Sequence, residues 1–410
     1  MKAMTLTLQL FLLVGILLGQ AHAEWPTPVR QAWLSYQTSA EGLENSAVAT
    51  FWGGLRRYRF FTHNKEGQRQ LPSPLFREGS FPIYLSASTQ SDRLFVFMPG
   101  IFGQPNKGLT PQFIDLLEGI GGHVLVVPNL LAPDYVRAYP LYGEDLVAHE
   151  VAVMESALDY ALKKLPQVKR IHVIAESLGT AIGSAWAAHD RTHQRRLSDL
   201  TLLWPPLDLR KAMTNFDAII DQHRPYAASC STLKKLSILA RHFLWTAFPG
   251  KLQKDEEGCV GAMVMVDGFI TATQRSWRAY SEAVRSSGTP PEGFEAYFRS
   301  YRPQLWQMLE QGDERLQLAH WFKRLKRDPH FPVRIATSQN DFLNRELSWD
   351  EFRREVKLSD DEFLQLSWGG HSGPVSVPRM QTLLAELFDE AALARQTEAA
   401  VAPGDAGVAR

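Results

Sequence analysis

A serine stands where a strand is expected to pass into a helix, and such a placement can make its hydroxyl reactive. Ser177 is the central residue of Ala175–Gly179, a small-x-Ser-x-Gly pentapeptide. The apolar run Arg170–Ile174 before it predicts a buried strand, and Thr180–Ala188 after it predicts a helix. A serine on a strained strand-to-helix corner exposes its hydroxyl, and the small residues around it avoid collisions with the neighbouring strand and helix. The pattern therefore predicts a nucleophilic serine.

Backbone N–H groups that could stabilise an oxyanion follow a strand further upstream. The apolar run Arg93–Met98 predicts a buried strand, and the glycine-bearing loop Gly100–Gln104 follows it. A loop of this kind can point N–H groups at the negative charge that develops on a carbonyl oxygen. We expect the donors to be the amides of Ile101 and of Leu178, the residue after the serine. Alone, the Pro-Gly pair at 99–100 would indicate an ordinary turn, but its place before a serine corner favours an oxyanion loop.

An aspartate and a histidine lie in two loops further along the chain. The short predicted strand Phe331–Thr337 ends in a loop that contains Asp341. The last predicted strand, Glu362–Trp368, runs into a loop in which glycines flank His371. These glycines allow a tight loop that can bring the imidazole over the edge of the sheet. Simpler roles remain open, because serine or aspartate can cap a helix and a loop histidine can be a surface residue.

The chain resembles the α/β-hydrolase superfamily, in which serine, acid and histidine follow one another in this order. The resemblance extends from about Leu94 to about Phe388. It implies that Ser177 is the nucleophile and His371 its general base. It also implies that Asp341 orients the imidazole and stabilises the imidazolium.

The chain departs from the commonest family pattern at two positions. Ala175 stands where glycine is usual, and alanine is small enough to fit. Pro99 stands where many members have a histidine, which is usually structural. Asp208 is an alternative acid, because it also follows a predicted strand, Leu200–Trp204. We rank it below Asp341, since it is well placed to cap the next segment.

Alternating strands and helices predict an α/β fold, with a mostly parallel sheet and helices on both faces. Ligands of such sheets bind beyond the carboxyl ends of the strands, where all the candidate residues lie. The stretch before the strand at Phe331 is far longer than a simple crossover needs, which predicts an inserted helical cap or lid after the sixth strand. The expected divisions are a signal peptide (1–23), a first core part (24–208), the cap (209–329), a second core part (330–390) and a disordered tail (391–410).

The predicted cap is rich in aromatic residues. We expect most of them to form the cap's own small core and a few to line an apolar acyl pocket. The sequence assigns no single cap residue to that pocket.

The N-terminus has the pattern of an export signal. Lys2 supplies a positive charge, Met4–Gly19 is an apolar stretch, and Ala21–Ala23 gives a small-x-small cleavage pattern. We expect the mature chain to begin at Glu24 and the protein to be periplasmic or secreted. An uncleaved membrane anchor is the alternative, which the short and interrupted apolar stretch disfavours.

The two cysteines and the balanced charge limit the classes of protein that the sequence allows. Cys230 and Cys259 both lie in the predicted cap, and an even pair in an exported protein indicates a disulfide, with two free thiols as the alternative. No close cysteine and histidine cluster and no His-Glu-x-x-His motif indicates zinc. The 44 basic and 44 acidic residues give a formal net charge of zero, which argues against nucleic-acid binding.

The sequence thus predicts an exported serine hydrolase that acts through an acyl-enzyme on a small-molecule or lipid-like acyl substrate. No metal or organic cofactor, no obligate protein partner and no membrane span in the mature protein is implied. Carboxylic ester hydrolysis is favoured, by analogy with the fold and because of the aromatic cap. A serine peptidase or amidase of the same fold is the nearest alternative. A non-catalytic binding protein on the hydrolase scaffold is the alternative from a different class.

Overall fold

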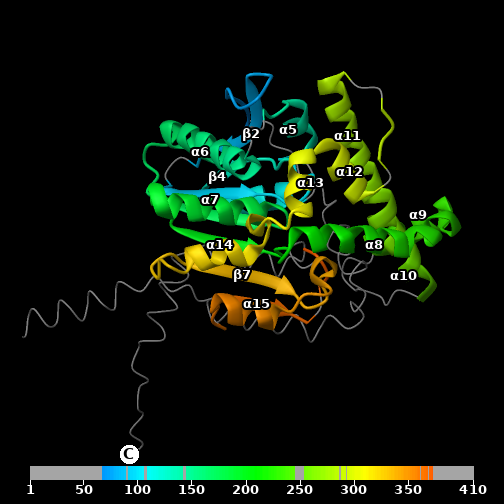
Figure 1. Ribbon diagram of the computed structural model, residues 1–410. Coiled ribbons are helices and arrows are strands. Elements are labelled where there is room, and N and C mark those ends of the chain that lie inside the picture. Colours follow the sequence, from blue (N-terminus) through cyan, green and yellow to red (C-terminus); the bar gives the residue numbers. More distant parts are fainter. Residues whose placement is uncertain are drawn as a thin grey trace, which may run out of the picture.

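The computed structural model describes residues 67–372, except 89–90, 106–108, 142–144, 245–253, 286–287, 292, 361 and 368 (Figure 1). The predicted signal peptide (1–23) and the predicted disordered tail (391–410) lie outside the described residues. No helix in the described part of the chain is long and apolar enough to cross a bilayer.

An eight-stranded sheet organises the chain, with strands in the order β1-β2-β4-β3-β5-β6-β7-β8. The strands are β1 (Gln68–Pro72), β2 (Ser80–Ser86), β3 (Arg93–Met98), β4 (His123–Val126), β5 (Arg170–Glu176), β6 (Asp199–Leu203), β7 (Val333–Ser338) and β8 (Phe363–Leu366). β2 pairs antiparallel with β1 and β4, and every other pair of neighbours is parallel. This mostly parallel sheet with an antiparallel edge confirms the predicted α/β-hydrolase fold.

Helices connect the parallel strands. Before the insertion they are α4 (Thr110–Gly119), α5 (Pro133–Arg137), α6 (Leu146–Lys164) and α7 (Gly179–His193); η4 (Phe342–Asn344) and α15 (Trp349–Val356) join β7 to β8. Between β6 and β7 lie α8 (Leu209–Ser229), α9 (Thr232–Leu244), α10 (Lys254–Gly261), the π-helix η2 (Ala262–Gly268), α11 (Phe269–Val284), α12 (Phe294–Tyr301), α13 (Pro303–Glu310), η3 (Glu314–Leu316) and α14 (Leu318–Leu325).

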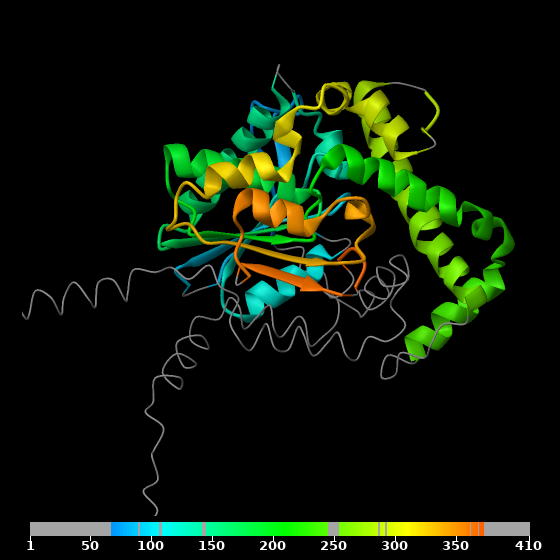
Figure 2. The same ribbon diagram turned by 60° about the horizontal axis from the view of Figure 1, so that its bottom comes forward.

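The central strands are apolar on both sides because the sheet is covered on both faces. In β3, Leu94 and Val96 belong to one apolar core, and Phe95 and Phe97 belong to another on the opposite face. Among the described helices, α4 covers the second face, whereas α6, α7, α14 and α15 cover the first (Figure 2). The two cores fix the sheet between them, and the loops at the strands' carboxyl ends are the parts that can carry a site.

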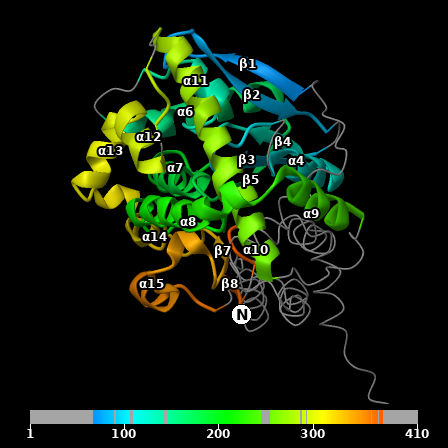
Figure 3. The same ribbon diagram turned by 90° about the vertical axis from the view of Figure 1, so that its right-hand side faces the viewer.

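Helices α8 to α12 lie beside the edge at which the parallel strands end. In Figure 1 the arrow of β7 points toward them, and Figure 3 looks onto this side, where α8 and α11 cross in front of the sheet. α8 packs against η4 and α12, and α11 packs against α5. α14, by contrast, packs against α7 and α15 in the helical layer on the sheet. The segment between β6 and β7 therefore supplies both a covering over the strand ends and part of the layer on the sheet.

Buried polar groups attach this covering to the core. The Ser276 hydroxyl of α11 donates to the Leu131 carbonyl at 2.8 Å. The guanidinium of Arg302, which is buried, donates to the neighbouring Leu130 carbonyl, also at 2.8 Å. Both acceptors lie in the loop after β4, so α11 and the segment after α12 meet the core at the same strand end.

A disulfide joins two of these helices, as the cysteine pair predicts. Cys230 ends α8 and Cys259 lies in α10, with Cα atoms 5.5 Å apart. The bond closes a loop with a sequence separation of 29 residues. It therefore constrains α8, α9 and α10 as one unit.

Removal of this disulfide should lower the stability of the protein without abolishing folding of the sheet. In the chain-entropy model a loop of this size contributes about 3 kcal/mol, because the crosslink restricts the unfolded chain. We expect the Cys230→Ser, Cys259→Ser double variant to unfold several degrees below the wild type in calorimetry. An unfolding temperature equal to that of the wild type, or alkylation of both cysteines in the native wild-type protein, would contradict this expectation.

Candidate active site

Ser177 occupies a sharp corner between β5 and α7. Its φ is +53°, in the left-handed region that non-glycine residues rarely adopt. Its N–H donates to the Leu203 carbonyl of β6 at 2.9 Å, and its carbonyl accepts from the Thr180 N–H at 3.0 Å. Hydrogen bonds to the neighbouring strand and to the first turn of α7 thus stabilise the strained corner.

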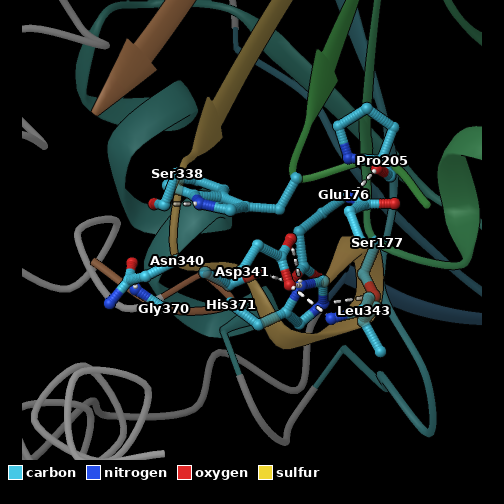
Figure 4. A network of polar contacts seen from close by, with 12 residues as sticks. Glu176, Ser177, Pro205, Ser338, Asn340, Asp341, Leu343, Gly370 and His371 are labelled. Atoms are coloured by element: carbon cyan, nitrogen blue, oxygen red, sulfur yellow. Dashed lines mark hydrogen bonds and ion pairs between the residues drawn. The ribbon is translucent and has the colours of Figure 1, made fainter. Parts of the chain in front are cut away.

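The structure brings the three predicted side chains together in one hydrogen-bonded chain (Figure 4). His371 Nε2 lies 2.7 Å from Ser177 Oγ. His371 Nδ1 lies 3.0 and 3.1 Å from the two carboxylate oxygens of Asp341. A nitrogen that faces a carboxylate carries the proton, which leaves Nε2 free to accept from the serine hydroxyl. This arrangement has the geometry that a general base needs to remove the proton of a serine nucleophile.

Contacts between the loops fix the acid and the imidazole. The Asp341 carboxylate also accepts from the Leu343 N–H at 3.0 Å, which orients it at the start of η4. The side-chain oxygen of Asn340 accepts from the Gly370 N–H at 2.9 Å and so joins the two loops. Gly370 has a φ of +59°, which explains why a glycine precedes His371 in this tight turn.

Asp208, the alternative acid, has a different environment. It is the N-cap of α8, and its carboxylate accepts from the Lys211 N–H at 3.0 Å. This is the ordinary hydrogen bond of a helix N-cap.

The two predicted oxyanion donors lie next to the serine corner. Leu178 directly precedes α7, so its N–H has no partner within the helix. Within the described ranges, neither the Leu178 N–H nor the Ile101 N–H donates to another protein group. The loop that carries Ile101 approaches Ser177 closely at Gly100, where an added Cβ would lie 2.9 Å from the serine Cβ. Glycine at this position therefore permits the close approach.

The departure from the family pattern at Ala175 has a compensating neighbour. A Cβ added to Gly183 of α7 would lie 2.9 Å from the Ala175 Cβ and 3.3 Å from the Met98 sulfur. Since Gly183 has no side chain, α7 packs against β5 with alanine where glycine is usual.

Two buried polar side chains, to which sequence reasoning gave no role, hold the same loops. The Glu176 carboxylate accepts from the Gly100 N–H at 2.7 Å and from the Ser372 hydroxyl at 2.6 Å. Asn129, in the loop after β4, donates to the carbonyl of Gly100. The sequence contains one hint of each, because Glu176 lies inside the serine pentapeptide and Asn129 closely follows a strand that ends at the same edge.

A row of aromatic rings from four segments leads away from the imidazole of His371. The Phe342 ring lies 5.6 Å from the His371 ring and 5.6 Å from that of Phe216 in α8. Phe216 lies 4.7 Å from Phe294 of α12, and Phe294 lies 6.0 Å from Phe102 in the loop after β3. We call these four phenylalanines the aromatic arc. The sequence predicts aromatic residues in the insertion, and the structure shows that Phe216 and Phe294 are among those beside the two loops.

The three residues of the hydrogen-bonded chain are buried. Ser177, Asp341 and His371 are only 4%, 2% and 8% exposed. A cavity of about 10 Å³, close to the minimum for one water molecule, lies beside the serine corner. Its lining is almost entirely aliphatic and includes Leu178, Ile182, Leu305, Leu316 and the side chain of Arg315.

The charged groups at the rim of the site are paired. The Arg315 guanidinium donates to Asp313 and to Asp145, each at 2.6 Å. The hydrogen bond between Arg315 and Asp313 raises the pKa of Arg315 and lowers the pKa of Asp313. Burial raises the pKa of the Asp217 carboxyl. The hydrogen bonds that this carboxylate accepts from the Phe294 and Glu295 N–H groups lower the pKa by a smaller amount. Arg315 is therefore a structural ion-pair partner at the rim.

Among the residues that the structure describes, no group of three or more histidine, cysteine, aspartate or glutamate side chains is placed to hold a metal ion.

The sheet order and the serine corner together define the chain as an α/β-hydrolase fold. No family model matches the chain, and a search of curated proteins finds no match. Similar solved structures include the esterase Pf2001 from Pyrococcus furiosus, with 11% identity and a TM-score of 0.43 over 79% of this chain and 89% of that one. Est1E from Butyrivibrio proteoclasticus has 13% identity and a TM-score of 0.40 over 81% and 99%. Proline iminopeptidase from Mycobacterium smegmatis has 12% identity and a TM-score of 0.39 over 80% and 99%.

Proposed function

We propose that this protein is a serine hydrolase in which Ser177 is the nucleophile, His371 the general base and Asp341 the acid of a catalytic triad. The observation that carries the proposal is the continuous hydrogen-bonded chain from Asp341 through His371 to Ser177, at the edge where the parallel strands end. A serine hydroxyl 2.7 Å from an imidazole nitrogen can lose its proton as it attacks a carbonyl carbon.

The reaction proceeds in two halves. His371 takes the hydroxyl proton while Ser177 Oγ bonds to the carbonyl carbon, and the amides of Ile101 and Leu178 donate to the resulting oxyanion. The intermediate collapses to an acyl-enzyme, and His371 gives the proton to the departing oxygen. Water then attacks the acyl carbon with His371 as base, which releases the acid and restores the serine. Asp341 stabilises the imidazolium in both halves.

We favour a carboxylic ester with an uncharged, apolar acyl group as the substrate. The aromatic arc and the cavity wall are apolar apart from Arg315, whose guanidinium is already paired with Asp313 and Asp145, so a charged substituent would be costly there. Recognition of a free amino terminus needs an available carboxylate. In the described part of the site, Glu176 and Asp341 both already have hydrogen-bond partners. These observations support a small-molecule or lipid-like acyl ester over a peptide.

We further propose that α8 to α12 act as a cap that moves during turnover. The cavity beside the serine is too small for an acyl chain, and the triad is buried. Movement of groups in the described covering would give substrate a path to Ser177, and the aromatic arc includes residues of both α8 and α12.

Export to the periplasm or the cell exterior is part of the same proposal. The Cys230–Cys259 disulfide supports it, because such bonds persist in oxidising compartments. The N-terminal signal pattern of the sequence supports it as well.

A matched pair of substrates tests the preference for esters. We expect the purified mature protein to hydrolyse 4-nitrophenyl butyrate faster than the 4-nitroanilide of the same acyl group, with Ser177→Ala as the blank for each. The physical reason is that both substrates place the same acyl group against the apolar wall, whereas the amide carbonyl is less electrophilic than the ester carbonyl. Equal turnover of the two, or faster turnover of an aminoacyl anilide, would instead identify a peptidase or amidase.

A further inference from the structure

We infer that Asn129 and Glu176 are positioning residues that fix the direction of the oxyanion-stabilising N–H of Ile101. This inference rests on the proposed hydrolase function, since it concerns how the same site is held ready for reaction. Both side chains bind the backbone of Gly100.

The peptide group between Gly100 and Ile101 sets the direction of the Ile101 N–H. Described peptide bonds are all trans, and in a trans peptide the C=O and the N–H point in opposite directions. A group that binds the Gly100 carbonyl therefore determines where the Ile101 N–H points. The Asn129 side-chain NH₂ donates to this carbonyl, and the Gly103 N–H donates to it at 2.9 Å. The Ile101 N–H is thus directed away from Asn129 and remains available for an oxyanion.

The Asn129 side chain can act in this way in one orientation only. Its NH₂ faces two carbonyl oxygens, those of Gly100 and Pro99, the latter at 3.1 Å. Its oxygen accepts from the Leu131 N–H at 2.9 Å. Exchange of the amide's nitrogen and oxygen would place an acceptor against two acceptors and a donor against a donor. Because Asn129 is buried, water cannot easily replace these partners.

Glu176 fixes the preceding peptide group from its other end. The Pro99 carbonyl accepts from Asn129, and the N–H of the same peptide, that of Gly100, donates to Glu176 at 2.7 Å. The second Glu176 oxygen accepts from the Ser372 hydroxyl at 2.6 Å, one residue after His371. The carboxylate thus joins the oxyanion loop to the loop of the general base, and a Cβ at Gly100 would collide with it at 2.5 Å.

These contacts are the preorganisation that oxyanion stabilisation requires. N–H groups that already point at the developing charge need no reorganisation when the reaction occurs. Without Asn129, the Gly103 N–H alone would hold the Gly100 carbonyl. The Gly100–Ile101 peptide could then rotate more easily and turn its carbonyl toward the substrate oxygen, which would place two acceptors face to face. Such a rotation would reduce the stabilisation of the transition state more than the stabilisation of the bound substrate.

Asn129→Ala should therefore lower kcat for 4-nitrophenyl butyrate by about 10- to 100-fold, less than the 10²–10³ cost of losing an oxyanion donor outright. KM should change little, because the substrate's ground-state contacts remain. Affinity for an aliphatic trifluoromethyl ketone, which adds to the serine and forms an oxyanion, should fall by a factor similar to that for kcat/KM. An unchanged kcat in folded Asn129→Ala would overturn the inference. So would a rise in KM as large as the fall in kcat, with no loss of ketone affinity.

Asn129→Asp adds a test that does not depend on the size of the side chain. The protonated carboxyl can still donate to the Gly100 carbonyl, whereas the carboxylate repels it. The ratio of kcat in Asn129→Asp to kcat in the wild type should thus fall as pH rises. A ratio that is independent of pH across the range where the wild type is active would contradict the proposed role.

Glu176→Gln, which retains an acceptor for the Gly100 N–H, should keep more activity than Glu176→Ala.

Asp190→Asn is the matched control for loss of a buried polar anchor. The Asp190 carboxylate is buried near the far end of α7 and accepts from the N–H groups of Arg196 and Leu197, each at 3.1 Å. This variant should lose stability but keep the wild-type kcat and ketone affinity. The results distinguish failure of the hydrolase function from failure of the positioning role. A wild type that is inactive on every ester overturns both proposals. An active wild type with an equally active Asn129→Ala overturns only the positioning role.

Discussion

Replacement of Ser177 by alanine should reduce kcat for ester hydrolysis by about 10⁶-fold, the scale found when a triad nucleophile is removed. The physical reason is that alanine has no oxygen to form the acyl-enzyme, while His371 and Asp341 remain as they were. Thermal unfolding should change little, because the side chains differ by one atom and the corner's backbone hydrogen bonds to Leu203 and Thr180 are kept. Initial rates and calorimetry of the two proteins measure both expectations.

Ser184→Ala supplies the matched control. Ser184 lies in α7 and is buried like Ser177, and in the described structure its hydroxyl has no hydrogen-bond partner. Its removal should leave kcat unchanged. Substantial activity in folded Ser177→Ala, or an equal loss in Ser184→Ala, would show that the chemistry does not depend on the Ser177 hydroxyl.

The second large effect is expected at the acid. Asp341→Asn should lower kcat by about 10⁴-fold, because the amide no longer stabilises the imidazolium and favours the wrong tautomer of His371. Asp208→Asn should stay close to the wild-type rate, since asparagine caps a helix about as well as aspartate. The pair compares the same chemical change at a carboxylate that faces the imidazole and at one that faces the Lys211 N–H.

The reverse result would reassign the acid of the triad. If Asp208→Asn lost more activity than Asp341→Asn, the hydrogen bonds between Asp341 and His371 would have no catalytic role. The pH dependence of kcat for both variants should accompany the measurement, because loss of the true acid changes the basicity of the imidazole.

The sequence was sufficient to predict which residues meet, because parallel strands place the ends of distant segments at one edge. Ser177, Asp341 and His371 follow β5, β7 and β8, and each of these strands is a short apolar run next to glycine or a polar loop. Hydrophobic periodicity detects such runs well. It is the order of the strands that converts separations of more than a hundred residues into contacts.

The roles of Asn129 and Glu176 could not be predicted in the same way. Both act on the backbone of a loop whose path depends on tight turns, and the hydrophobic pattern of the sequence does not encode those turns. Glu176 lies at a buried strand end, where a carboxylate is unexpected unless its oxygens have partners, whereas for Asn129 the sequence shows only its place just after a strand.

The packing of the insertion was also beyond the sequence. Apolar periodicity predicts helices between β6 and β7 but does not say what each helix contacts, so α14 could not be separated from the helices over the strand ends. Phe216 and Phe294 meet because Asp217 accepts from the N–H of Phe294 at 2.7 Å and holds the start of α12 against α8. Such long-range capping leaves no local pattern in the sequence.

The most direct test of the central claim is labelling of the purified mature protein with a fluorophosphonate, with wild type beside Ser177→Ala and the adduct located by mass spectrometry. We expect a single adduct on Ser177 of the wild type and none on the variant, because only an activated serine attacks the phosphorus centre. A well-folded wild type that hydrolyses esters but carries its adduct on another residue, or labels equally in Ser177→Ala, would contradict the account.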